Sequence, residues 1–204
     1  MSVGKPEKRR RTMSHGLLLN ARLFLLLLEA DRELAAEIRA QGCLCGGRLH
    51  SARYPRKPRG GVPLELREEY RWRESLCCER EGCRRRTTPP SLRFMGRRAY
   101  LGALVVLVSA MTGGVTERRA AAMRELVGVN VRTLQRWRAW WLKTFPETVF
   151  WRQARGRMAS PVDEGRLPAS LLERFPGDGA GSGLLACLRF LAPITTRSRY
   201  AMAV

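Results

Sequence analysis

The chain has 204 residues, in which 38 Lys and Arg outnumber 18 Asp and Glu and give a formal net charge of +20. Its 45% hydrophobic content argues against wholesale disorder and fits one medium-sized domain or two small ones. The charge favours an anionic partner such as nucleic acid and disfavours cationic ligands.

The positive charge comes mainly from arginine and is unevenly distributed. Only four cations are lysines, which leaves 34 arginines. Arginine makes bidentate contacts with phosphate and guanine, although an Arg-rich codon usage would produce the same bias. The net charge is +9 over residues 48–98, +7 over 99–157 and +4 over the first twelve, so the remaining residues are neutral together. Codon usage alone does not explain that concentration.

The N-terminal region resembles a signal peptide only superficially. A basic segment over 1–15, which we expect to be a disordered tail, precedes a Leu-rich run. Asn20 and Arg22 interrupt this run, and no small-x-small cleavage site follows it. The run is also too short to span a bilayer. We therefore expect a soluble protein without a membrane partner, located in the cytoplasm and associated with the nucleoid.

Residues 16–41 predict one long helix that ends at Gly42. Leu27, Leu34 and Ile38 recur at helical spacing, which indicates one buried face. This helix either pairs with a second copy, which would make the protein a homodimer, or packs onto the small unit that follows it in the chain.

Five of the six cysteines fall in two short clusters. The first cluster is Cys43-Leu-Cys45, followed by two glycines, and the second contains Cys77, Cys78 and Cys83. Two close cysteine pairs on Gly-containing turns are typical of a zinc ribbon, in which four thiolates form a tetrahedron around Zn²⁺. Without a credible export signal, metal binding is favoured over disulfides. The clusters therefore predict a structural zinc site.

The predicted zinc ligands are Cys43, Cys45, Cys78 and Cys83. Cys77 is the alternate to Cys78, because neighbours in a strand point to opposite faces and only one can reach the metal. His50 is a second alternate, although its position is more typical of a strand residue. The competing interpretation is a set of free, reduced and buried thiols. Cys187 lies in an apolar segment and is interpreted as a core residue.

Between the cysteine clusters, the sequence predicts two strands joined by a basic loop. Alternating residues over 48–54 and 70–76 indicate the strands, and the Pro- and Gly-rich stretch 55–61 indicates the loop. Basic loops can follow a phosphate backbone or enter a minor groove, while a solvated turn has a similar composition. The expected DNA contacts in this region, including the last ribbon strand, are Arg56, Lys57, Arg59, Arg84, Arg85 and Arg86.

The next region predicts two helices before a tight Gly turn. The first covers 97–111 and is broken at Thr112-Gly113-Gly114. The second begins after Thr116, a capping residue that is followed by Glu117 in the first turn, and runs to residue 126.

The helix after the Gly turn has the features of a DNA recognition helix. Gly128 permits a left-handed backbone and Asn130 can cap a helix over 131–141. The predicted inward stripe is Leu134, Trp137 and Trp141. In a helix-turn-helix, exposed residues on the N-terminal half read bases in the major groove. The expected DNA contacts are Arg132, Thr133, Gln135, Arg136 and Arg138. The competing interpretation is an ordinary basic helical hairpin.

The string from Val127 to Trp137 resembles helix-turn-helix units of transposases and bacterial regulators. With the cysteine clusters and the stretch CRRRTTPPSLRFMGRRAY at 83–100, residues 42 to 145 resemble the DNA-binding front end of bacterial insertion-sequence proteins. One departure is Arg124, where a small residue usually stands. The resemblance implies modules that bind transposon ends as double-stranded DNA, while a separate nuclease domain cuts.

Catalysis is not expected. A nuclease domain needs acidic residues that hold two metal ions, and the segment beyond residue 145 has few acids and many Pro and Gly. His15 and His50 are the only histidines, and no Ser-His-Asp or Cys-His constellation is apparent. We expect a DNA-binding accessory protein or truncated transposase that acts with a separately encoded transposase. A transcriptional regulator and an RNA-binding zinc-ribbon protein are the alternatives.

The expected fold class is α+β and mostly helical, with a small zinc-ribbon β unit, a helix-turn-helix bundle and a short helical tail. Within that tail, helices are expected over 168–175 and 182–191. The expected organisation is a basic tail, an N-terminal helix, a zinc ribbon with a basic loop, a helix-turn-helix and a C-terminal extension, over 1–15, 16–41, 42–96, 97–145 and 146–204.

Overall fold

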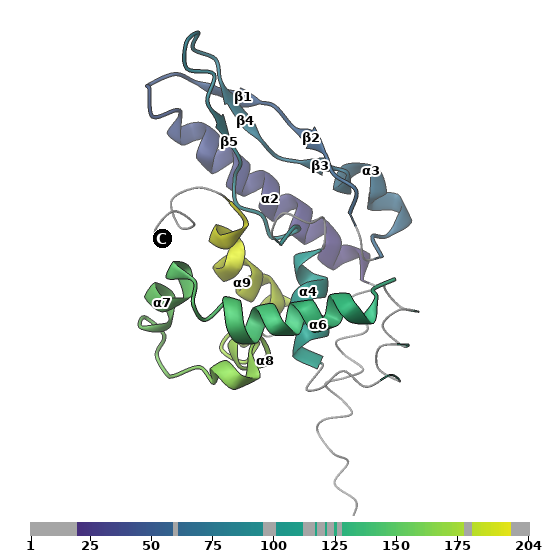
Figure 1. Cartoon of the computed structure of the whole chain (residues 1–204). Helices are drawn as coiled ribbons and strands as arrows, with labels where there is room; N and C mark the ends of the chain where they lie inside the picture. The colour runs from purple at the N-terminus through teal and green to yellow at the C-terminus, as the bar shows by residue number, and fades with distance from the viewer. Residues whose placement is uncertain are drawn as a thin grey trace, which may run out of the picture.

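The computed structural model describes residues 20–58, 61–95, 101–111, 117, 121, 125, 128–177 and 181–196. This part of the protein is α+β and mostly helical, with two small antiparallel sheets at one end of the molecule (Figure 1). The expected fold class is confirmed at that level. Among the described residues, no helix has the length and apolar character needed to cross a bilayer. The expected basic tail over 1–15 lies outside them.

The longest of the described helices, α2 (Ala21–Gln41), runs behind the sheets in Figure 1. The Asn20 side chain caps it by accepting a hydrogen bond of 2.9 Å from the backbone N–H of Arg22. It ends at Gly42, whose φ of 73° favours glycine. The predicted end at Gly42 is confirmed, while residues 16–19 lie outside the described part. The buried face of α2 is made of Leu23, Phe24, Leu27, Leu28, Ala30, Asp31 and Ala35.

Two small antiparallel sheets lie alongside α2. The three-stranded sheet has the order β1 (Leu49–Ser51), β4 (Leu76–Cys78) and β5 (Arg86–Thr87). The two-stranded sheet pairs β2 (Tyr54–Pro55) with β3 (Trp72–Arg73). The two predicted strands are therefore each divided into two shorter ones.

The prediction of a strand starting at residue 70 is wrong, because a helical segment ends there. A 3-10 turn, η1 (Leu64–Leu66), leads into α3 (Arg67–Tyr70). Val62, Leu66 and Tyr70 recur every four residues and are buried, which is the periodicity of a helix and not of a strand. The Tyr70 hydroxyl donates a 2.6 Å hydrogen bond to the Phe24 carbonyl and so attaches this segment to α2.

A buried ion pair fixes α2 to the segment that follows β5. Asp31 and Arg93 are fully buried, and Arg93 Nε donates to Asp31 Oδ2 at 2.8 Å. Asp31 also accepts hydrogen bonds of 2.6 Å from Ser91 Oγ and from the Leu92 backbone N–H. Arg93 Nη2 donates to the Trp72 carbonyl at 2.9 Å, which brings β3 into the same network.

The main core is built around α4 (Gly102–Met111), which lies at the centre of the helical part in Figure 1. The C-terminal helices pack on it and contribute Leu171, Leu184 and Leu188 to the same core. The expected C-terminal helices are therefore present and belong to this core. The helical elements after α4 are α6 (Val131–Ala139), η2 (Trp140–Thr144), α7 (Val149–Arg155), η3 (Glu164–Arg166), α8 (Ala169–Leu172), α9 (Ser182–Leu191) and η4 (Ala192–Thr195).

The helix expected over 117–126 is only partly described. Glu117, Ala121 and Glu125 are helical and exposed, and the other residues of that helix lie outside the described part. The predicted break at 112–114 also lies outside it. The third predicted helix corresponds to α6 and its π-helical continuation η2.

Candidate metal centre and basic surfaces

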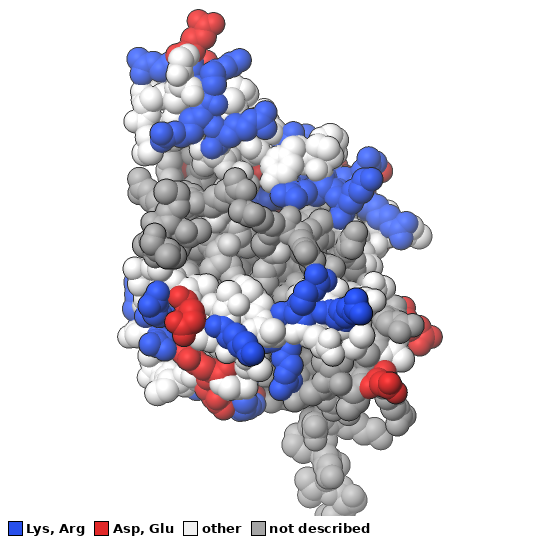
Figure 2. Space-filling view, viewed as in Figure 1, with Lys and Arg blue, Asp and Glu red and all other residues white. Residues whose placement is uncertain are grey.

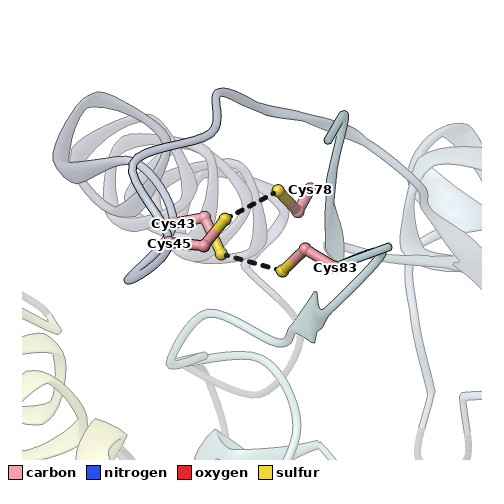
Figure 3. Close-up of side chains that lie close together, drawn as sticks. All are labelled: Cys43, Cys45, Cys78 and Cys83. Atoms are coloured by element: carbon pink, nitrogen blue, oxygen red, sulfur yellow. Dashed lines mark hydrogen bonds between the residues drawn. The ribbon is translucent and has the colours of Figure 1, made fainter. Parts of the chain in front are cut away.

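Four cysteines from two distant parts of the chain point toward one another (Figure 3). Cys43 and Cys45 lie on the turn after α2, Cys78 ends β4, and Cys83 lies on the turn before β5. We call β1, β4, β5 and these two turns the cysteine unit. Cys78 is buried and the other three are partly buried. This is the ligand set that the sequence predicts.

The sulfur positions fit a single ion. The Sγ atoms are 3.7 Å apart for Cys43 and Cys83 and 3.5 Å apart for Cys45 and Cys78, and all four lie within 4.8 Å of one another. Four thiolates at about 2.3 Å from a tetrahedral metal ion are about 3.8 Å apart. The described cluster can therefore hold a metal ion with little rearrangement.

The turn after α2 depends on its glycines. The backbone N–H of Cys43 donates to the Gly47 carbonyl at 2.9 Å, and that of Gly46 donates to the Cys43 carbonyl at 2.8 Å. Gly46 has a φ of 80°, where a side chain would be strained. A Cβ at Gly47 would lie 2.7 Å from Cys78 Sγ and 3.4 Å from Cys45 Sγ. Gly47 therefore leaves the space that the thiols need.

Backbone N–H groups donate to three of the four sulfurs. The backbone N–H of Gly47 donates a hydrogen bond to Cys45, that of Arg80 donates to Cys78, and that of Arg85 donates to Cys83. The Gly47 N–H, with neighbouring thiols, lowers the pKa of Cys45 to about 6. The Arg80 N–H lowers the pKa of Cys78, but burial and the neighbouring thiols outweigh it and raise that pKa to about 12. The thiolate of Cys45 is thus favoured, whereas the raised pKa values of Cys78 and Cys83 mean that these two thiols need a cation to ionise beside it.

The alternate ligands lie outside the cluster. His50 is exposed on β1 and pairs in register with Cys77 on β4. The Cys77 thiol donates to the Arg84 carbonyl at 3.6 Å, away from the other sulfurs. Cys187 is fully buried on α9, as the sequence predicts, and burial raises its pKa to about 12.

The cysteine unit has only a small apolar core of its own. Leu49, Leu76 and Cys78 are its buried members, and Ile38 of α2 packs against them. This cluster is separate from the main core around α4. A unit with so few buried side chains gains little hydrophobic stabilisation, so a bound ion would supply much of its stability.

The α6 helix presents a polar row beside its buried stripe. Leu134, Trp137 and Trp141 are buried, as the sequence predicts. Exposed side chains on the N-terminal half of α6 are Arg132, Gln135 and Arg136, and Arg138 is half-buried.

The prediction that Thr133 faces outward as a DNA contact is wrong. It is only 5% exposed, and its Oγ1 accepts a 3.0 Å hydrogen bond from Arg136 Nη2. The reason is its place on the helix, because Thr133 is adjacent to Leu134 on the side that faces the core. Thr133 therefore orients Arg136 and does not itself face solvent.

Basic side chains also gather over the sheets. Figure 2 shows Lys and Arg over the strands and over α6 on one face of the molecule. Lys57 is exposed, and so are the predicted contacts Arg84, Arg85 and Arg86. Arg56 is half-buried, donates to the Tyr54 hydroxyl at 3.3 Å and lies 5.1 Å from the centre of that ring. Arg59 lies outside the described residues.

Trp72 on β3 is an exposed aromatic residue that was not predicted from the sequence. Its exposed fraction is 40%, and the Arg53 guanidinium lies 6.0 Å from the centre of its ring. The available signal was a tryptophan between two arginines, Arg71 and Arg73. That signal was ambiguous because the other tryptophans of the chain are largely core residues.

Comparison with known proteins yields no matching family model, no matching curated protein and no matching solved structure.

Proposed function

We propose that this protein binds double-stranded DNA in a sequence-specific manner, with a zinc-held cysteine unit and α6 as the recognition helix. The observation that carries the proposal is the exposed row of Arg132, Gln135 and Arg136 on the N-terminal half of a capped helix. These side chains offer the groups that pair with guanine and adenine edges in a major groove.

The local structure around α6 supports this role. Gly128 has a φ of 63°, and the Asn130 side chain accepts a 2.8 Å hydrogen bond from the Arg132 backbone N–H. Val129 is 2% exposed, so the turn is anchored in the core immediately before the helix begins. A short, anchored turn fixes the direction of α6, and its buried stripe fixes its rotation. Both are required of a helix that reads bases.

Zinc is the proposed ion because the donor set is four thiolates. Cys₄ sites are typical of structural Zn²⁺, while hard cations such as Mg²⁺ and Ca²⁺ prefer oxygen ligands. A closed set of four protein ligands leaves no open position for a substrate. The proposed role of the ion is therefore to hold the turns and the basic strand β5 in place.

The basic surface over the sheets supports a phosphate contact. Arg84, Arg85 and Arg86 are exposed and follow the second cysteine turn directly. Cations on a rigid support can follow the DNA backbone without reading its sequence. In this proposal α6 supplies specificity, and the cysteine unit supplies affinity and orientation.

The proposed setting is a mobile element, as the resemblance of residues 42 to 145 implies. In that setting this protein binds the ends of the element, and a separately encoded transposase performs the cutting. The same modules on a promoter would make a transcriptional regulator.

Selection from a random duplex library tests the proposal. We expect the metal-loaded protein to enrich one sequence motif, and Arg136→Ala to relax the preference at one position. Arg85→Ala should weaken binding to all duplexes alike and reduce the salt slope by about one. Arg157→Ala, which removes an exposed cation beyond α7, is the matched control. Enrichment of no motif would contradict sequence specificity, and equal effects of Arg85→Ala and Arg157→Ala would contradict the phosphate contact.

A further inference from the structure

The two-stranded sheet presents a face that neither the cysteine cluster nor α6 explains. Trp72 on β3 lies directly opposite Pro55 on β2. Residues that are directly opposite in an antiparallel pair project on the same side of a sheet. Trp72 is therefore held at a fixed position on the outer side, and its 40% exposure is a property of the strand pairing.

Alternating exposure over residues 53–57, the segment that contains β2, places two cations on the same side as Trp72. Arg53, Pro55 and Lys57 are exposed, whereas Tyr54 and Arg56 between them are half-buried. The Arg53 guanidinium lies 6.0 Å from the centre of the indole ring. We call Arg53, Pro55, Lys57 and Trp72 the Trp72 face.

Two exposed acidic side chains on the neighbouring helix α3 pair with other residues. On α3, Glu68 pairs with Arg71 at 3.0 Å and Glu69 pairs with Arg32 at 2.5 Å. Residues 51–58 contain no acid. The Trp72 face is thus an exposed indole with cations beside it, which is complementary to an anionic ligand that has a flat apolar surface.

A nucleotide base with its phosphate has this chemistry. In a duplex the base faces are covered by stacking and only the edges are accessible. Proteins that hold a single strand place exposed aromatic rings against base faces and basic groups against the backbone. A guanidinium at the outer limit of cation–π contact can move to a phosphate when a base takes its place on the ring.

From this geometry we propose that the Trp72 face stacks against an unpaired base of a DNA strand next to the bound duplex. The inference rests on the proposed duplex binding, because Figure 2 shows basic side chains over the strands and over α6 on one face. Trp72 supplies the stacking surface, and Arg53 and Lys57 supply the phosphate contacts.

Fluorescence anisotropy with labelled oligo(dT) of about 12 nucleotides, using the metal-loaded full chain, tests the inference. We expect Trp72→Ala to weaken this binding about tenfold or more, and Trp72→Phe to keep most of it. Arg53→Ala should weaken it as well, without removing a packed side chain. The controls are Leu64→Ala, which shortens another exposed apolar side chain, and Arg157→Ala.

Duplex binding is measured on the same variants and separates the two proposals. Trp72→Ala should bind blunt duplex as the unchanged protein does. Equal oligo(dT) affinity in Trp72→Ala and Leu64→Ala would overturn the inference while leaving duplex binding intact, and so would unchanged affinity in Arg53→Ala. Tighter binding to oligo(rU) than to oligo(dT) would also overturn it, since the ligand would then be RNA. Failure of the unchanged protein to bind any duplex would overturn the proposed function itself.

Discussion

Adjacent cysteines on β4 have different environments. The Cys78 thiol is buried in the cluster 3.5 Å from Cys45, whereas Cys77 donates to the Arg84 carbonyl. The alternation of a strand separates them, because one faces the turn after α2 and the other faces away. One of two neighbouring cysteines is therefore suited to hold an ion.

A pair of serine variants tests this difference. We expect Cys78→Ser to retain less than about half an equivalent of zinc, because a three-thiolate site is weaker. Cys77→Ser should retain about one equivalent per chain. Elemental analysis of the purified proteins measures both. Loss of metal from Cys77→Ser with retention in Cys78→Ser would reverse the assignment.

Burial also determines how much Asp31 contributes to the stability of the fold. Its carboxylate accepts three hydrogen bonds in a fully buried site, including one from the Arg93 guanidinium. We expect Asp31→Asn to lower the free energy of unfolding by about 3–5 kcal/mol, since the Arg93 charge would remain buried without its partner. Chemical denaturation measures the change.

The exposed ion pair between Glu33 and Arg189 provides the control for Asp31. Its side chains are 61% and 56% exposed. Glu33→Gln should therefore cost less than about 1 kcal/mol. Equal losses in the two variants would show that burial of the Asp31 pair is not the cause.

At the scale of elements, η3 is attached to α7 by one carboxylate. Glu164 Oε1 accepts hydrogen bonds from Trp151 Nε1 at 2.7 Å and from Arg155 Nη1 at 2.8 Å. The hydrogen bond from Trp151 lowers the pKa of Glu164 from its usual value of 4.5, and Arg155 lowers it further by a smaller contribution. The charged carboxylate is therefore favoured in the folded state.

This attachment predicts a pH dependence. A lowered folded-state pKa adds stability that is fully present above the unfolded pKa and is lost as the pH falls through the folded pKa. At neutral pH, the free energy of unfolding should therefore be higher for the unchanged protein than for Glu164→Gln, by less than about 1 kcal/mol. The midpoint of thermal unfolding should be higher in the same order. The difference should shrink as the pH falls below 4.5. A difference that grows on acidification would contradict the assignment, and Glu147→Gln is the control.

Elements with a clear periodic pattern were predictable from the sequence. The end of α2 at Gly42 and the buried stripe of α6 follow from spacing and a single glycine. The cluster of Cys43, Cys45, Cys78 and Cys83 was predictable because the two short cysteine motifs each lie on a Gly-containing turn. The helical segment ending at Tyr70 was not predicted, although Val62, Leu66 and Tyr70 recur every four residues, because the alternating residues over 70–76 favoured a strand.

Single polar residues were less predictable. Thr133 is buried because α6 is rotated by its tryptophan stripe, and no local pattern indicates which side Thr takes at the edge of that stripe. The Asp31–Arg93 pair joins residues 62 positions apart, so no spacing could reveal it. Exposure of Trp72 depends on its register with Pro55.

At the scale of the whole molecule, the described residues form two separate cores of unequal size. The larger joins α2, α4, α6 and the C-terminal helices, and the smaller lies in the cysteine unit. An ion in the cysteine cluster would stabilise the smaller core directly, while the larger has many buried apolar side chains of its own.

Metal removal should therefore act locally. We expect chelation to increase hydrogen exchange in β1, β4 and β5 and to leave α4 and α9 protected. The far-UV circular dichroism of the helices should persist. Hydrogen exchange with mass spectrometry measures this, with zinc re-addition as the control. Equal loss of protection in α4 and α9 would show that the two cores unfold together.

The position of α9 in the main core has a consequence for synthesis on the ribosome. The centre of that core is incomplete until Leu184, Cys187 and Leu188 have been synthesised, and these residues lie near the end of the described chain. The four cysteines of the cluster are complete once Cys83 has emerged. A nascent chain that bound an ion at this cluster would therefore order the cysteine unit long before the apolar face of α4 is covered. During that interval the apolar residues of α4 lack the α9 side chains that cover them in the folded protein.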